Sequence, residues 1–143
     1  MSFTKSLAKW IVGLRYEDLP PQVVPWVKAA TTDYFAVALA GCPAEGLQIL
    51  RKHVWSQYAK GDVTIIGDTE RMSAEAATLY NATMAHWEEY DDATYGMAGH
   101  PSVVTMPALF AACELGSATG RDFITDYAAA VEVCAKVGRL TYP

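Results

Sequence analysis

One run of residues constrains the fold more than any other part of the sequence. Between Trp26 and Ala40 the chain reads WVKAATTDYFAVALA, so nearly every face of a helix built from it is apolar. Because a helix that is apolar all round is normally buried, we expect this run to form the central helix of the protein. Pro20 and Pro21 suit the first turn of that helix, and Gly41 predicts its end in the left-handed conformation.

The rest of the chain is also mainly helical in character. Five further stretches predict helices, at residues 3–14, 44–60, 73–87, 103–115 and 121–137, with Gly61 expected to end the second of these. A β-branched run at residues 63–66 is too short for a helix and predicts one isolated extended segment. We therefore expect an all-α, bundle-like domain of about six helices and one short extended segment, spanning residues 1–143.

The composition excludes several classes of protein. With 143 residues, of which 52% are hydrophobic, the chain can bury a core, and long disordered stretches are not expected. Eleven Lys and Arg against 16 Asp and Glu give a net charge of −5 without a basic run, so nucleic acid is not an expected partner. No stretch is apolar enough for a bilayer span or a signal-peptide core, which predicts a cytoplasmic protein without membrane contact.

The segment 88–101 is the part of the chain that looks least like core. It reads EEYDDATYGMAGHP, with no apolar period, two glycines, a histidine and four acidic residues within five positions. Carboxylates at the C-terminus of a helix face the unfavourable end of the helix dipole, so helix stabilisation does not explain their placement. This pattern indicates either a functional loop or a solvated helix end.

Acid–base chemistry and metal binding both remain open for this loop. His100 lies between Gly and Pro on a constrained loop, and a carboxylate such as Asp92 can pair with it for proton transfer. A metal ion is the competing interpretation, although the spacing matches no particular metal motif. The residues that such a metal site would use are His86, Asp91, Asp92 and His100.

An ordered series of motifs resembles the N-terminal domain of the MmgE/PrpD family. The series includes LPP at 19–21, IIG at 65–67, HWEEYDDAT at 86–94, MAGHPS at 97–102, MPAL at 106–109 and ATGRDF at 118–123. The resemblance covers the whole chain. This family includes 2-methylcitrate dehydratase, cis-aconitate decarboxylase and iminodisuccinate epimerase.

The resemblance implies a fold and a chemistry. It implies an all-α N-terminal domain, a homodimer, no organic cofactor, no essential metal, and small di- or tricarboxylic acids as substrates. It also implies that a base removes a proton next to a carboxylate, after which hydroxide leaves, carbon dioxide leaves, or a proton returns on the other face. Dehydration of the 2-methylcitrate type is the predicted reaction, with decarboxylation and epimerisation as alternatives.

The resemblance also assigns roles to individual residues. It places the catalytic residues at His100, Asp91, Asp92 and Thr94, with His100 as the proton-transfer group. It places substrate contacts at Ser102, Glu89 and His86, and it assigns no metal ligand. Glu89 stands where relatives commonly carry aspartate, so the longer side chain is expected to alter the substrate geometry.

The length of the chain is the larger departure from the family. Family members are several times longer, and their second domain contributes lysines and a lid to the same cleft. We therefore expect a partial domain whose acidic site lacks the cations that an anionic substrate needs. Three alternatives remain open: a piece of a full enzyme, one part that works with a separate C-terminal portion, or a non-catalytic dimerisation module.

Overall fold

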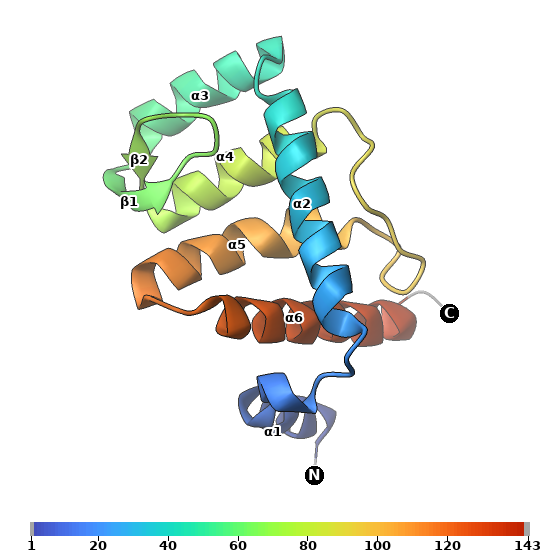
Figure 1. Ribbon diagram of the computed structural model, residues 1–143. Coiled ribbons are helices and arrows are strands. Elements are labelled where there is room, and N and C mark those ends of the chain that lie inside the picture. Colours follow the sequence, from blue (N-terminus) through green and yellow to red (C-terminus); the bar gives the residue numbers. More distant parts are fainter. Residues whose placement is uncertain (1, 142–143) are drawn as a thin grey trace.

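The computed structural model describes residues 2–141 and confirms the expected all-α class (Figure 1). Six α-helices, one short 3-10 helix and a two-stranded sheet make up this part of the chain. In chain order they are α1 (Phe3–Gly13), η1 (Tyr16–Asp18), α2 (Val23–Gly41), α3 (Glu45–Gln57), β1 (Lys60–Thr64), β2 (Arg71–Met72), α4 (Ala74–His86), α5 (Pro101–Gly116) and α6 (Gly120–Thr141).

The core lies where α2 crosses the stack formed by α4, α5 and α6 (Figure 1). Tyr34 of α2, Met84 of α4 and Met106 of α5 are completely buried there. The Tyr34 hydroxyl donates a long hydrogen bond of 3.5 Å to the carbonyl oxygen of Asn81, and burial raises the pKa of this phenol well above its ordinary value. These contacts fix α4 and α5, between which the acidic segment runs.

Helix α2 is less central than its sequence predicts. One face packs against α4, α5 and α6, whereas its other face is open: Trp26 is 67% exposed and Leu39 is 55% exposed. Gly41 does not adopt the expected left-handed conformation and is the last residue of the helix. Its role is close packing, because a Cβ atom at this position would lie 2.1 Å from the carbonyl oxygen of Met84 in α4.

The extended segment is not isolated, as the sequence predicted, but pairs with a second short strand. β1 runs antiparallel to β2, and the connection turns at Gly67, whose φ is +75°. Gly61 lies in β1 and therefore does not end α3, which stops at Gln57. Asn81 of α4 fastens the segment by donating to the Thr64 carbonyl and accepting from the Ile66 amide, both at 3.0 Å.

Two helix boundaries bear directly on the site. Helix α5 begins at Pro101, two residues earlier than expected, so that His100 is its N-cap residue and proline occupies the first turn. Helix α6 continues to Thr141, four residues beyond the expected end. None of the helices within residues 2–141 has the length and apolar character needed to cross a lipid bilayer.

Candidate functional site

The segment between α4 and α5 folds back on itself as a tight loop. Thr94 and Gly99 pair in antiparallel fashion, with amide-to-carbonyl distances of 2.9 and 3.3 Å. The Thr94 hydroxyl accepts a hydrogen bond from the Gly96 amide at 3.2 Å, and Ala98 adopts a positive φ of 49°. Tyr95 at the tip is fully exposed. The backbone pairing thus sets the direction from which the chain reaches His100.

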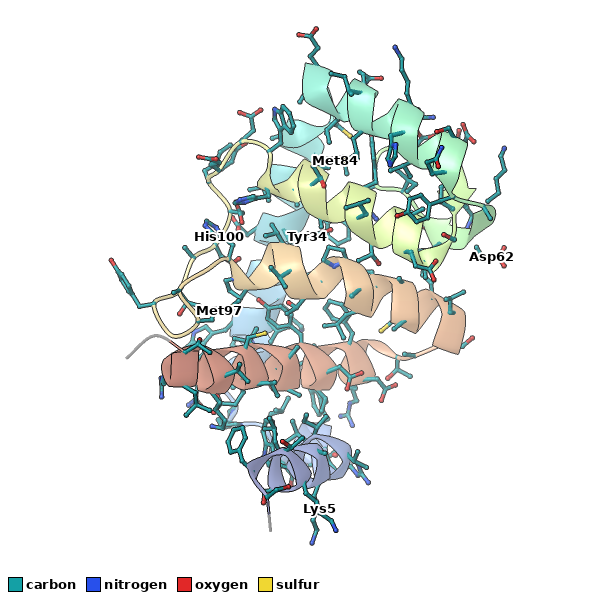
Figure 2. The ribbon with its side chains drawn as sticks, turned by 180° about the vertical axis from the view of Figure 1, so that it is seen from behind. Lys5, Tyr34, Asp62, Met84, Met97 and His100 are labelled. Atoms are coloured by element: carbon teal, nitrogen blue, oxygen red, sulfur yellow. The ribbon has the colours of Figure 1, made fainter. Side chains whose placement is uncertain are left out.

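Helix α6 supports this loop from below. Figure 2 shows Met97 beside the C-terminal part of α6 and His100 where α5 begins. A Cβ atom at Gly138 would lie 2.6 Å from the Met97 Cα and 2.8 Å from the Gly96 carbonyl oxygen. The loop backbone therefore rests directly on the helix at Gly138, a contact that only glycine permits without displacement.

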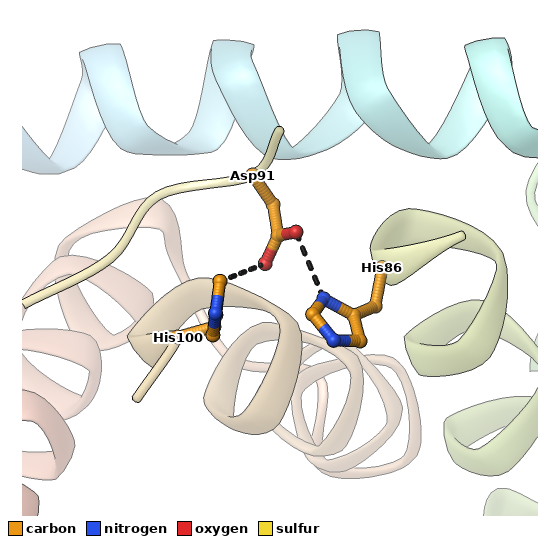
Figure 3. Close-up of side chains that lie close together, drawn as sticks. All are labelled: His86, Asp91 and His100. Carbon is orange, nitrogen blue, oxygen red and sulfur yellow. Dashed lines mark hydrogen bonds and ion pairs between the residues drawn. The ribbon is translucent and has the colours of Figure 1, made fainter. Parts of the chain in front are cut away.

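A buried carboxylate with two imidazole neighbours forms the centre of the site (Figure 3). The Asp91 side chain is 1% exposed, and its two oxygens face different histidines. His86 Nδ1, at the end of α4, lies 2.9 Å from Oδ1, and His100 Nδ1, at the start of α5, lies 3.0 Å from Oδ2. The two rings meet edge to face, with their centres 4.7 Å apart. Residues at both ends of the loop thus converge on one acid.

The two contacts of Asp91 differ in their hydrogen-bond geometry. The His86 contact has the geometry of a hydrogen bond. The His100 contact has the right length, but its atoms are not aligned as a hydrogen bond requires, and neither atom has another partner among the described residues. The His100 contact is therefore a close approach of two polar groups rather than a formed hydrogen bond.

Asp92 supports the loop through a second hydrogen-bond network, which reaches the buried Ser102 and Tyr127. Ser102 donates its hydroxyl to Asp92 Oδ2 at 2.6 Å, and its amide donates to Oδ1 at 3.0 Å. Because that hydroxyl has a single proton, Tyr127 of α6 must be the donor in its 2.8 Å contact with Ser102. Burial raises the pKa of Tyr127, which keeps the phenol protonated for this role.

Two hollows open beside the histidines. One of about 590 Å³ lies between α4 and the start of α5 and is lined by His86, by Glu89 and by mostly apolar neighbours. The other, of about 480 Å³, is formed by the loop and is lined by Thr94 and His100, among others. Glu89 has a positive φ of 55°, a strained conformation that is often found at functional sites. No described residue lining either hollow is Lys or Arg.

The same cluster is the donor set that could hold a metal ion. One atom each from His86, Asp91 and His100 lie within 4.8 Å of one another. Two imidazoles and one carboxylate suit zinc or ferrous iron. In the arrangement described here the carboxylate oxygens lie 2.9 and 3.0 Å from the two Nδ1 atoms, and a hydrogen bond accounts for the contact of His86.

The structure brings some of the predicted site residues together and places others apart from them. His86, Asp91 and His100 come together, while Thr94 and Glu89 line the hollows. Two residues are engaged elsewhere: the partly exposed Asp92 holds the start of α5, and Ser102 is 1% exposed with its hydroxyl committed to Asp92 and Tyr127, so neither lines these two hollows.

Sequence reasoning missed Tyr127 and Gly138. Both lie on α6, where a tyrosine and a glycine within a regular helical pattern give no sign that they touch a loop far away in the sequence. The signals that did point to the site were all local to residues 86–102. A pattern within one helix reports which face is buried, but not which neighbour covers it.

Comparison with known proteins finds a matching family profile and related proteins. The sequence profile described as the MmgE/PrpD N-terminal domain matches residues 5–143. A cis-aconitate decarboxylase-like protein of Aspergillus oryzae, oryM, is 27% identical over 146 residues, which cover 97% of this chain and 30% of that protein. A cis-aconitate decarboxylase of Aspergillus terreus is 25% identical over 118 residues, covering 82% of this chain and 24% of that protein. The chain thus spans less than a third of the length of these relatives.

Proposed function

Because the chain belongs to the MmgE/PrpD family, we propose that it supplies the proton-transfer part of a lyase or isomerase site for small di- or tricarboxylic acids. The observation that carries this proposal is the pairing of His100 with the buried Asp91 beside an open hollow. A carboxylate that accepts from Nδ1 leaves Nε2 as the basic nitrogen of the ring. His100 can then exchange a proton with substrate at Nε2 while Asp91 stabilises the imidazolium.

Decarboxylation of a cis-aconitate-like acid is the reaction to test first, since the relatives above carry that name. In such a step the bond to one carboxyl carbon breaks, carbon dioxide leaves, and its electron pair stays on the substrate carbon. Imidazolium at His100 then gives its Nε2 proton to that carbon. Dehydration of 2-methylcitrate and epimerisation of iminodisuccinate need the same kind of proton transfer and are the alternative reactions.

The proposal requires cations that the two hollows do not supply. A substrate with two or three negative charges would face Glu89 in one hollow and would find no Lys or Arg among the described lining residues of either. We propose that these cations come from a further portion of the protein or from a second copy of the chain. The chain alone should accordingly bind such acids weakly.

A labelled protein can test the site without turnover. We expect cis-aconitate, titrated into ¹⁵N-labelled chain, to shift the resonances of the loop around Thr94 and of the His100 side chain, with millimolar affinity. Acetate, with the same charged group on a minimal skeleton, serves as the control ligand. His100→Gln should reduce the affinity at least severalfold, whereas His53→Gln on the exposed face of α3 should leave it unchanged. Shifts confined to other elements, or identical effects of acetate, would contradict the proposal.

A second candidate function is assembly without catalysis. It is favoured by the large apolar side chains that the surface presents on two helices, Trp26 and Leu39 of α2 and Val104 of α5, which are 55–67% exposed. Exposed apolar side chains of this size are typical of interfaces when they form one patch. A stable dimer that dissociates on Leu39→Lys, combined with no cis-aconitate shifts at the loop, would favour this candidate over the first.

A further inference from the structure

We propose that His86 is a positioning residue for His100, acting through the carboxylate that they share. This inference deepens the proposed function, since it concerns the same proton-transfer site. The relevant geometry is the chain His86 Nδ1, Asp91 Oδ1, Asp91 Oδ2 and His100 Nδ1, with contacts of 2.9 and 3.0 Å at its two ends (Figure 3). His86 fixes the orientation of the Asp91 carboxylate, and that carboxylate in turn orients the His100 ring.

Burial makes Asp91 dependent on its two neighbours. A carboxylate withdrawn from water needs hydrogen-bond donors for both oxygens, and each unsatisfied oxygen is costly. The Asp91 side chain is 1% exposed, and the two imidazoles are the only polar side chains among the described residues that its oxygens pair with. Without the donor on His86, Oδ1 would lose its partner, and the carboxylate would gain by turning towards His100 or towards solvent.

The difference between the two contacts assigns the holding role to His86. Its hydrogen bond to Oδ1 is aligned, and its ring is anchored by the last turn of the regular helix α4. The contact between Oδ2 and His100 Nδ1 is close but not aligned, and His100 follows the loop. An aligned bond on one side fixes the plane of the carboxylate, so that the other oxygen faces the His100 ring.

The tautomers follow from this arrangement. An ionised carboxylate only accepts hydrogen bonds, so the His86 ring must carry its proton on Nδ1 when neutral. At 3.0 Å an unprotonated His100 Nδ1 would set its lone pair against Oδ2, which favours the Nδ1–H form for His100 as well. The Nε2 atoms are then free. Because His86 lines the larger hollow and His100 lines the loop hollow, Asp91 lies between two rings that open on different sides. Substituting His86 should therefore alter the tautomer of the His100 ring without changing any residue that lines the loop hollow.

Two substitutions separate this role from a general structural role. The side-chain amide of asparagine places its NH₂ group near the position of a histidine Nδ1, whereas leucine fills similar space without a donor. His86→Asn should preserve the Nδ1–H tautomer of His100, and His86→Leu should convert His100 to a mixture of tautomers. The matched control is His53→Asn on α3, since His53 is exposed and lies outside the cluster of His86, Asp91 and His100.

Long-range ¹H–¹⁵N correlation spectra of the histidine rings provide the measurement, because the nitrogen shifts distinguish the two tautomers. In the unsubstituted chain above neutral pH we expect His86 and His100 in the Nδ1–H form and His53 averaged between forms. Circular dichroism of each variant verifies folding. Should His86→Leu fail to fold, the tautomers of the unsubstituted chain and the rescue by asparagine still decide the question.

Three results would overturn the inference. The first is an Nε2–H tautomer on His86 in the unsubstituted chain, and the second is an unchanged His100 spectrum in folded His86→Leu. The third is stoichiometric Zn²⁺ binding that both His86 variants abolish, which would assign the cluster to a metal. None of these measurements involves substrate, so the inference can fail while the proposed function stands. If instead cis-aconitate does not bind while both rings keep the expected Nδ1–H tautomer, the proposed function fails and the inference about His86 stands.

Discussion

Removing the Ser102 hydroxyl should destabilise the protein more than a single serine normally does. This hydroxyl donates to Asp92 at 2.6 Å and accepts from Tyr127 at 2.8 Å, and the residue is 1% exposed. A hydrogen bond to a charged group contributes about 1.5–3 kcal/mol, and one between neutral groups about 0.5–1.5 kcal/mol. Ser102→Ala leaves a buried phenol without its partner, so we expect a loss of about 2–4 kcal/mol in the free energy of unfolding.

Urea unfolding at neutral pH, followed by circular dichroism, measures this loss. The unfolding entropy of a chain of 143 residues is about 0.3 kcal/mol/K, so the melting temperature should fall by roughly 7–13 °C. Ser6→Ala, on the exposed face of α1, is the matched control and should change the stability by less than about 0.5 kcal/mol. Tyr127→Phe removes one of the two bonds, and the double variant measures the coupling between them.

The result that would refute this reasoning is a Ser102→Ala protein within about 0.5 kcal/mol of the unsubstituted chain at an unchanged m-value. That outcome would mean that water replaces the hydroxyl without cost. If Ser102→Ala lowers the free energy of unfolding but shows no coupling to Tyr127→Phe, the whole loss would come from the hydrogen bond to Asp92. In that case the α6 end of the network would contribute nothing to holding the start of α5.

Three further predictions concern packing and pH. Gly41→Ala should cost about 1–3 kcal/mol by urea unfolding, because its Cβ would meet the Met84 carbonyl oxygen and force α2 from α4; unchanged stability would contradict the close approach. Gly138→Ala should shift the amide resonances around Met97 and speed their hydrogen exchange while α2 and α4 keep theirs, and a uniform change would disprove a local contact. Burial raises the pKa of Tyr127, so the folded state holds this proton when the unfolded chain has lost it, and stability falls as pH rises above about 10. Tyr127→Phe should make that alkaline decline shallower, and an identical decline in both proteins would refute the assignment.

The helices were predictable because each carries its own signal. Apolar spacing and the flanking glycines and prolines placed all six, with errors mainly at their ends. The failures share a cause. Gly41 ends α2 as predicted, but without the expected left-handed conformation, and its role is the close contact with Met84 in another helix. The two-residue strand β2 has no pattern of its own and exists because β1 offers it a partner. Local sequence does not encode such distant contacts.

The candidate site was predictable only in part, for a similar reason. The density of acids and the lone His100 marked the loop, since neither pattern suits a core. The sequence did not show that Asp91 would be buried while Glu89 stays exposed. The burial of each side chain depends on the direction that the chain takes after α4, which no local pattern predicts. The pairing of His86 with Asp91 likewise depends on that turn. Spacing along the chain therefore identified the members of the site, but not their partners.

The contact between Gly138 and Met97 has a consequence for the order of folding. The loop cannot take its final shape until the last turns of α6, far along the chain, are in place beneath it. Helices α2, α4 and α5 all precede α6 in the chain and make their own contacts with one another. In a chain synthesised from its N-terminus we therefore expect these three helices to pack first, and the region around His100 to acquire its native geometry only when α6 joins them. A protein synthesised from its N-terminus would have this site incomplete until residue 138 had left the ribosome.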